Sequence, residues 1–185
     1  YPAFQKKKVI LYAPTFRDQH LDHFEVPLDW DRLYDELKDE YIFVVKFHPA
    51  VNKGAGLNQR HDFIIDCPKD VDVNELLLVT DFLITDYSSI PFEFALLNKP
   101  MIFYPYDLKY YQENRGFWGE YERMVPGPLA FYTEEIIQYI KADNFDMKRI
   151  INFSSIWNHY STGNSSYNLI TYLYQYSRKP ASGRS

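Results

Sequence analysis

The chain has 185 residues, of which 46% are hydrophobic, and it includes 17 Tyr, 14 Phe and a formal net charge of −5. This length suits one domain with a full core, and the apolar, aromatic composition excludes an intrinsically disordered chain. The acidic balance argues against a nucleic-acid partner, because proteins that neutralise a phosphate backbone are rich in Lys and Arg. No apolar run approaches the ~18 residues of a membrane-spanning helix.

Metal and disulfide chemistry find little support in the sequence. Cys67 is the single cysteine, so an internal disulfide is excluded, no cysteine cluster can hold a metal, and a cytoplasmic location is expected. His20 and His23 lie three residues apart, but no third ligand is near them, and exposed polar side chains are the favoured interpretation. We therefore expect no metal and no cofactor.

The two ends of the chain suggest a piece of a longer protein. The start is basic but lacks the apolar region of a signal peptide, and a strand follows almost at once. The last residues, 179–185, are small and polar. We expect residues 1–178 to form one domain of a larger protein and residues 179–185 to form a linker or tail.

Short apolar runs alternate with helical patterns, which predicts an α/β fold with a parallel, Rossmann-like sheet. The predicted strands are 9–13, 41–47, 63–66, 82–84 and 101–104. The predicted helices are 29–40, 74–80, one that begins at residue 90, 133–141, 146–153 and 165–176. Residues 105–128 are predicted to be a long aromatic loop, with side chains that serve function or fill the core.

The most informative segment is the polar turn between the strand at 82–84 and the helix that follows. Its residues are Thr85, Asp86, Tyr87, Ser88 and Ser89. A strand, a polar turn and a helix place backbone N–H groups and hydroxyls at a helix N-terminus, which favours an anion such as phosphate. Glu93 lies one turn beyond Ser89 on the same face, where its carboxylate suits a sugar hydroxyl. The alternative is an ordinary capped helix, because Ser and Asp are common N-caps.

Basic and imidazole side chains follow two other predicted strands. Arg17 comes just after 9–13, and Lys46 and His48 lie two residues apart at the end of 41–47, so they face the same way. Ligands of open α/β sheets bind at this edge, and a Lys and a His together suit a phosphate. The alternatives are an ion pair between Arg17 and an acid such as Asp18, and a His48 held by a backbone carbonyl.

A further candidate for an anion contact is Arg115, near the middle of the aromatic loop. Its neighbour Gly116 marks a turn there.

Six segments, taken together and in order, resemble the CDP-glycerol glycerophosphotransferase family, the teichoic acid polymerases and primases of Gram-positive cell walls. The segments are 8–17, 45–49, 83–93, 98–103, 115–117 and 126–128, and the resemblance covers roughly residues 8 to 175. It implies a two-domain glycosyltransferase fold of the GT-B type, of which this chain is the C-terminal half. Residues 160–166 depart from a family motif that usually reads Asp-Gly-Lys-Ala-Ser, and Glu93 stands where the family often has Asp.

The resemblance also implies a reaction, the transfer of glycerol phosphate or a related polyol phosphate from CDP-glycerol to a membrane-anchored teichoic acid acceptor. His48 is then catalytic, Ser88 and Ser89 hold the pyrophosphate, Arg17 and Lys46 add charge, and Glu93 binds the ribose. The N-terminal domain of the same enzyme supplies a His-Gly motif, so this chain alone is expected to be inactive. The implied location is the inner face of the cell membrane, reached through parts outside this chain.

Two alternatives stay open on the sequence. One is a GT-B glycosyltransferase that uses a sugar nucleotide as its donor. The other is a non-catalytic nucleotide-binding module.

Overall fold

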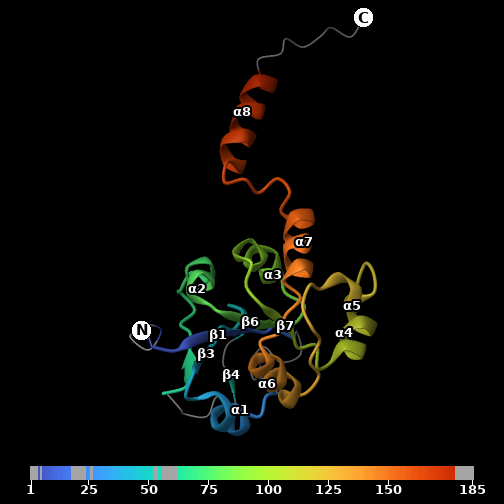
Figure 1. Ribbon diagram of the computed structural model, residues 1–185. Helices are drawn as coiled ribbons and strands as arrows, with labels where there is room; N and C mark the ends of the chain where they lie inside the picture. The colour runs from blue at the N-terminus through green and yellow to red at the C-terminus, as the bar shows by residue number, and fades with distance from the viewer. Residues whose placement is uncertain are drawn as a thin grey trace, which may run out of the picture.

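Five parallel strands form the central sheet (Figure 1). The structure is a computed structural model that describes residues 4, 6–17, 24–25, 27–51, 54–55 and 62–177. The sheet has the order β5-β3-β1-β6-β7, with β1 at Lys8–Ala13, β3 at Tyr41–Val45, β5 at Ile64–Asp66, β6 at Phe82–Thr85 and β7 at Met101–Phe103. Counted along the chain this order is 3-2-1-4-5, the arrangement of half a doubly wound Rossmann fold. The predicted fold class and all five predicted strands are confirmed.

The helices cover both faces of the sheet. They are α1 at Trp30–Leu37, α2 at Val73–Val79, α3 at Ile90–Phe94 with a 3₁₀ turn at Ala95–Leu97, α4 at Leu108–Asn114, α5 at Tyr121–Met124, α6 at Thr133–Ala142, α7 at Met147–Trp157 and α8 at Ser165–Ser177. The Asp29 side chain accepts a hydrogen bond from the Arg32 amide at the start of α1, and Asp72 caps α2 in the same way. A second small sheet pairs β2 (Phe24–Glu25) with β4 (Gly54–Ala55) in parallel. Each of these strands has only two residues, which is too short to show a periodic pattern, so neither was predicted from the sequence.

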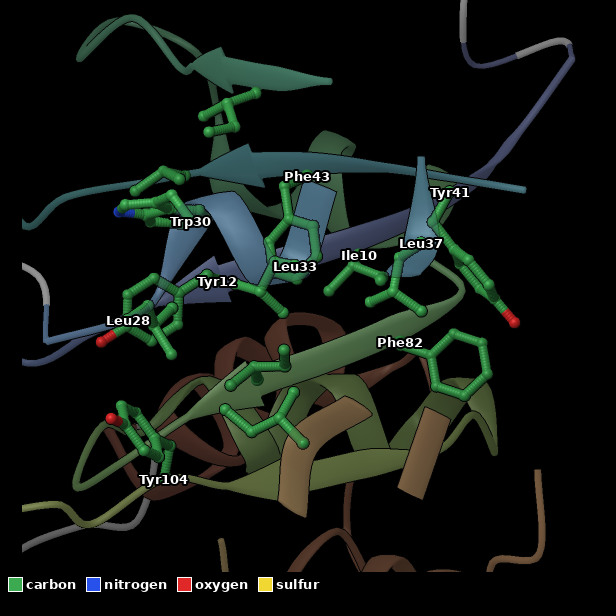
Figure 2. Close-up of a cluster of buried hydrophobic side chains, with 14 of the residues drawn as sticks. Ile10, Tyr12, Leu28, Trp30, Leu33, Leu37, Tyr41, Phe43, Phe82 and Tyr104 are labelled. Atoms are coloured by element: carbon green, nitrogen blue, oxygen red, sulfur yellow. The ribbon is translucent and has the colours of Figure 1, made fainter. Parts of the chain in front are cut away.

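Side chains alternate along β1 and so build two cores. Ile10 and Tyr12 join Phe43 of β3 on one face, where Leu33 and Leu37 of α1 cover them (Figure 2). Val9 and Leu11 point to the other face, toward buried residues of α2, α3 and α7. Strands covered on both faces are apolar almost throughout, which is the pattern that made them recognisable in the sequence.

The predicted loop at 105–128 is wrong in part, because it contains α4 and α5. These helices span Leu108–Asn114 and Tyr121–Met124, too short for a helical repeat to stand out in the sequence. Two of the loop's aromatics, Tyr111 and Phe117, pack around Tyr87, whose ring stacks on Tyr111 with centroids 3.7 Å apart. The core-filling interpretation therefore holds for this part of the segment.

Helix α8 extends away from the α/β body (Figure 1), and none of its residues is buried. Its exposed apolar and aromatic side chains are Tyr167, Leu169, Ile170, Tyr172, Leu173, Tyr174 and Tyr176. An apolar helix surface of this kind is normally covered in a folded protein. Across the part of the chain that the structure describes, every helix falls short of the length and hydrophobicity required to cross a membrane.

The buried tyrosines predict alkaline unfolding. Burial raises the pKa of Tyr104 to about 12, and burial and Asp86 raise the pKa of Tyr12 above its usual value. The ordinary tyrosine pKa is about 10, so the folded state prefers the neutral ring. This contribution to stability is complete below about pH 10 and is lost as the pH rises from about 10 to about 12. We expect cooperative unfolding in that window, coincident by far-UV circular dichroism and tyrosinate absorbance.

In the control variant Tyr104→Phe, the group cannot ionise, although the hydrogen bond to the Pro27 carbonyl is lost. We expect stability at neutral pH to fall by about 1 kcal/mol and the alkaline loss to become less steep. If all tyrosines of the parent chain titrate near pH 10 while the fold stays intact, this account is wrong.

Candidate functional site

A cavity of about 430 Å³ lies at the carboxyl ends of the strands, next to the β1–β6 boundary where the strand order reverses. Its walls come from four segments, with Ala13, Pro14, Thr15 and Phe16 after β1, Lys46, Phe47, His48 and Pro49 after β3, Lys69, Val71 and Val73 after β5, and Ser88, Ser89 and Ile90 after β6. Both its size and its place are those of a small-molecule site in an open α/β fold. The structure thus brings together four of the predicted site residues, Lys46, His48, Ser88 and Ser89.

The hydroxyl of Ser88 belongs to the framework of this cavity. Thr85 Oγ1 donates to the Ala13 carbonyl (2.7 Å) and lies 3.0 Å from Ser88 Oγ. The single hydroxyl proton of Thr85 is donated to the carbonyl, so Ser88 is the donor in the second contact. Ser88 Oγ also accepts from the Ile90 amide at 3.2 Å. Ser89 is exposed at the cavity wall and makes no capping hydrogen bond, so its hydroxyl is available to a ligand.

The N-terminus of α3 offers less attraction to an anion than the sequence predicted. Helix α3 has five residues, and the first turn offers few donors because Ile90 N–H bonds to Ser88, Pro91 has none, and Phe92 N–H bonds to the Ser89 carbonyl. The macrodipole of so short a helix is small. Side chains must therefore supply most of the attraction for an anion.

His48 is exposed at the cavity, and its orientation is defined. Its Nδ1 accepts a hydrogen bond from the Ala50 amide (3.1 Å), and its ring lies against Phe16 with centroids 4.5 Å apart. A nitrogen that accepts carries no proton, so the neutral imidazole bears its proton on Nε2. The predicted alternative, a backbone carbonyl partner, is not the observed one. His48 can present an Nε2–H donor to a ligand.

Lys46 and Lys69 both line the cavity but differ in exposure. Lys46 is 8% exposed, and its ammonium donates to the carbonyls of Pro68 (2.6 Å) and Lys69 (3.1 Å). Lys69 is exposed and donates to the Pro49 carbonyl at 3.1 Å. No sequence pattern pointed to Lys69, because it follows a strand of three residues inside a loop.

Arg17 lies outside the cavity, in a buried ionic network. Its guanidinium donates to both carboxylate oxygens of Asp107 (2.7 and 2.8 Å), to Asp86 (3.0 Å) and to the Thr15 carbonyl (2.6 Å). These four hydrogen bonds use all but one of its five N–H groups. The ion-pair alternative therefore describes Arg17, with partners other than Asp18, which lies outside the described residues. The proposed phosphate contact finds no support in this geometry.

The same network holds Asp86 and Tyr87. Asp86 is 2% exposed and accepts from the amides of Thr15 and Tyr87 as well as from Arg17. Burial raises the pKa of the Asp86 carboxyl, and Arg17 opposes that shift. Burial and Asp107, which accepts the Tyr87 hydroxyl at 2.9 Å, raise the pKa of Tyr87 far above its usual value. Thr85, Asp86 and Tyr87 thus fix the turn and do not line the cavity as free ligand groups.

The other predicted residues lie beyond the cavity walls. Glu93 is exposed on α3. The Arg115 guanidinium carbon lies 5.9 Å from the centre of the Phe16 ring, the ring that contacts His48, which places it at the rim. His20 and His23 fall outside the described residues, and within the described ranges no group of His, Cys, Asp and Glu forms a metal site.

Residues 1–175 match the protein family described as CDP-Glycerol:Poly(glycerophosphate) glycerophosphotransferase. The chain belongs to this family. The family predicted from the sequence is therefore confirmed.

Two relatives illustrate the range within the family. The teichoic acid glycerol-phosphate primase of Bacillus subtilis (strain 168) is 44% identical over 169 residues, which are 91% of this chain and 44% of the primase. The teichoic acid poly(ribitol-phosphate) polymerase of Bacillus spizizenii is 51% identical over 158 residues, 83% of this chain and 25% of that polymerase. This chain thus spans less than half the length of the curated relatives it matches, and its similarity extends to glycerol and ribitol proteins alike.

Solved structures of the wall teichoic acid polymerase TagF share the fold. One superposes with a TM-score of 0.74 at 32% identity, covering 92% of this chain and 43% of the TagF chain. Another, from a His-to-Asn variant of TagF soaked with CDPG, gives a TM-score of 0.72 at 31% identity and covers 92% of this chain and 42% of that one.

The ionic network makes a prediction about stability. Replacing Arg17 by Met leaves the buried Asp86 and the largely buried Asp107 without their cation, and we expect a loss of about 3–5 kcal/mol in the free energy of unfolding. Urea denaturation measures this loss. The matched control is Arg123→Met, which breaks an exposed pair with Glu120 and should cost less than about 1 kcal/mol. Equal small effects of the two substitutions contradict the assigned role of Arg17.

Proposed function

We propose that the cavity binds the cytidine diphosphate part of CDP-glycerol or a related CDP-polyol, and that the chain is the donor-binding part of a polyol-phosphate transferase. The observation that carries the proposal is the convergence of Lys46, Lys69, His48 and Ser89 on one cavity at the strand-order reversal. Family membership supports this donor class, because the family is described as a glycerophosphotransferase that acts with CDP-glycerol. A TagF variant that shares this fold was soaked with CDPG, which gives further support for a donor of this class.

The cavity is lined by both polar and apolar side chains, which suit the two parts of such a donor. Ser89, His48 and Lys69 offer hydroxyl, imidazole and ammonium groups to the pyrophosphate. Val71, Val73 and Ile90 provide an apolar wall for the cytidine. Glu93, one turn along α3, stays a proposed contact to the ribose.

In the proposed reaction, an acceptor hydroxyl attacks the phosphorus that carries glycerol. A new P–O bond forms to the acceptor, the P–O bond to CMP breaks, and the acceptor proton passes to a base. Such a reaction depends on positioning and on stabilising negative charge. His48 fits this role because its Nε2–H can donate to the transferred phosphoryl group or to the leaving phosphate oxygen.

The acceptor and the base come from elsewhere in this proposal. We propose a teichoic acid or a related lipid-linked polymer as acceptor, at the inner face of the membrane, and an N-terminal domain of the same enzyme that completes the site. Support comes from the length of the relatives, more than twice the matched segment for the primase. The exposed apolar surface of α8 is consistent with a further covering domain.

Donor binding gives a direct test. We expect this chain to bind CDP-glycerol or CDP-ribitol in isothermal titration calorimetry with a Kd below about 1 mM, the weak end for a specific ligand. UDP-glucose, titrated under the same conditions, should bind more weakly by at least about tenfold. A preference for the hexose nucleotide favours a glycosyltransferase. Absence of binding by both CDP-polyols at millimolar concentration removes the proposed donor site.

The role of His48 is tested in the full-length enzyme by His48→Ala. Loss of a proton donor to the reacting phosphate should lower kcat by about 10²–10⁴-fold, measured as CMP release. His159→Ala is the matched control, because His159 is exposed beyond α7 and contacts Tyr160. Near-normal turnover of the His48 variant refutes the catalytic assignment.

A further inference from the structure

Two tight turns face each other at the carboxyl ends of β3 and β5. In the first turn the Val51 amide donates to the His48 carbonyl at 2.9 Å, and in the second the Val71 amide donates to the Pro68 carbonyl at 3.3 Å. Two lysines tie the turns together in opposite directions. The ammonium of Lys46, just before the first turn, bonds to the second, and that of Lys69, in the second turn, bonds to Pro49 in the first.

Lys46 is built as a support for the second turn. Its side chain is buried, and its ammonium is held by two carbonyl oxygens, those of Pro68 and Lys69. The Pro68 carbonyl also closes its own turn through the Val71 amide. A phosphate that took over the Lys46 ammonium would leave these carbonyls without their charged partner, which costs stability where they are partly buried.

Lys69, in contrast to Lys46, has an exposed side chain. Its backbone carbonyl is one of the two that accept from Lys46, while its own side chain is exposed and lines the cavity. The ammonium makes a single described hydrogen bond, to the exposed Pro49 carbonyl, and an ammonium carries three N–H donors. A water-exposed donor can turn to a ligand at little cost, because water replaces it at the carbonyl.

Among the described residues, two other basic groups named by the sequence are less suited to this role. Arg17 is occupied by Asp86 and Asp107 outside the cavity, and Arg115 lies at the rim on Phe16. A pyrophosphate diester carries two negative charges, so an accessible cation within the walls matters for its binding.

We propose that Lys69 is the cation that binds the donor pyrophosphate, and that Lys46 is a positioning residue that acts by holding the turn that carries Lys69. This inference rests on the proposed function, because it assigns residues within the same donor site. It reverses the expectation from the sequence, in which Lys46 supplies the charge.

The test uses this chain and CDP-glycerol, with Kd measured by calorimetry and Tm by thermal unfolding. We expect Lys69→Met to raise Kd about tenfold without changing Tm, and Lys69→Arg to restore most of the affinity, because a charge-assisted contact is lost and regained. The difference between the parent chain and Lys69→Met should shrink as salt rises from 0.05 to about 0.5 M, since exposed charges are screened. Lys148→Met on α7 is the charge-matched control, because Lys148 is exposed and is not among the residues that line the cavity.

Lys46→Met separates positioning from binding. We expect it to lower Tm and to weaken CDP-glycerol binding, and the double variant Lys46→Met/Lys69→Met should bind no more weakly than Lys69→Met alone, because one residue acts through the other. Normal affinity in Lys69→Met, with the parent chain binding CDP-glycerol, overturns this inference and leaves the proposed function intact. Failure of the parent chain to bind overturns both.

Discussion

The buried guanidinium of Arg17 is the interaction on which the rest of the site depends. It connects three segments that are far apart in the sequence, the end of β1, the turn after β6 through Asp86, and the start of α4 through Asp107. Tyr87, Tyr106 and Tyr111 surround it with their rings, at 5.0 to 5.4 Å from the guanidinium carbon. A buried ionic group is tolerated only when its hydrogen bonds are satisfied, so the network fixes the relative positions of these segments.

That constraint divides the polar residues of the turn into two sets. One set forms hydrogen bonds within the protein and so holds the turn against β1; its members are Thr85, Asp86 and Ser88. Ser89 also lines the cavity and is exposed. A rigid inner set and an exposed outer residue are what a pre-organised anion site requires, because the framework then needs no rearrangement when the ligand arrives.

Much of the fold could be predicted because parallel strands buried on both faces have a strong signature, as in the apolar runs of β1 and β3. The convergence of His48 with Ser88 followed from the same rule about strand ends. The sequence could not reveal that Asp107 lies beside Arg17, because a contact across 90 residues depends on the packing of α4. Nor could it distinguish Lys46 from Lys69, since the direction in which each ammonium points is set by two facing turns.

The imidazole of His48 is exposed at the cavity, so water reaches this part of the site. Its ring rests on Phe16, its Nδ1 accepts a hydrogen bond from the Ala50 amide, and the residue as a whole is exposed. Phosphoryl transfer is favoured where water is excluded, because charge interactions strengthen there and hydrolysis is prevented. The groups aligned in this chain are therefore suited to holding and polarising a donor, and an open imidazole at the edge of the cavity is suited to a second surface that closes over it. If the proposed N-terminal domain covers this edge, it excludes water from around His48 as it completes the site.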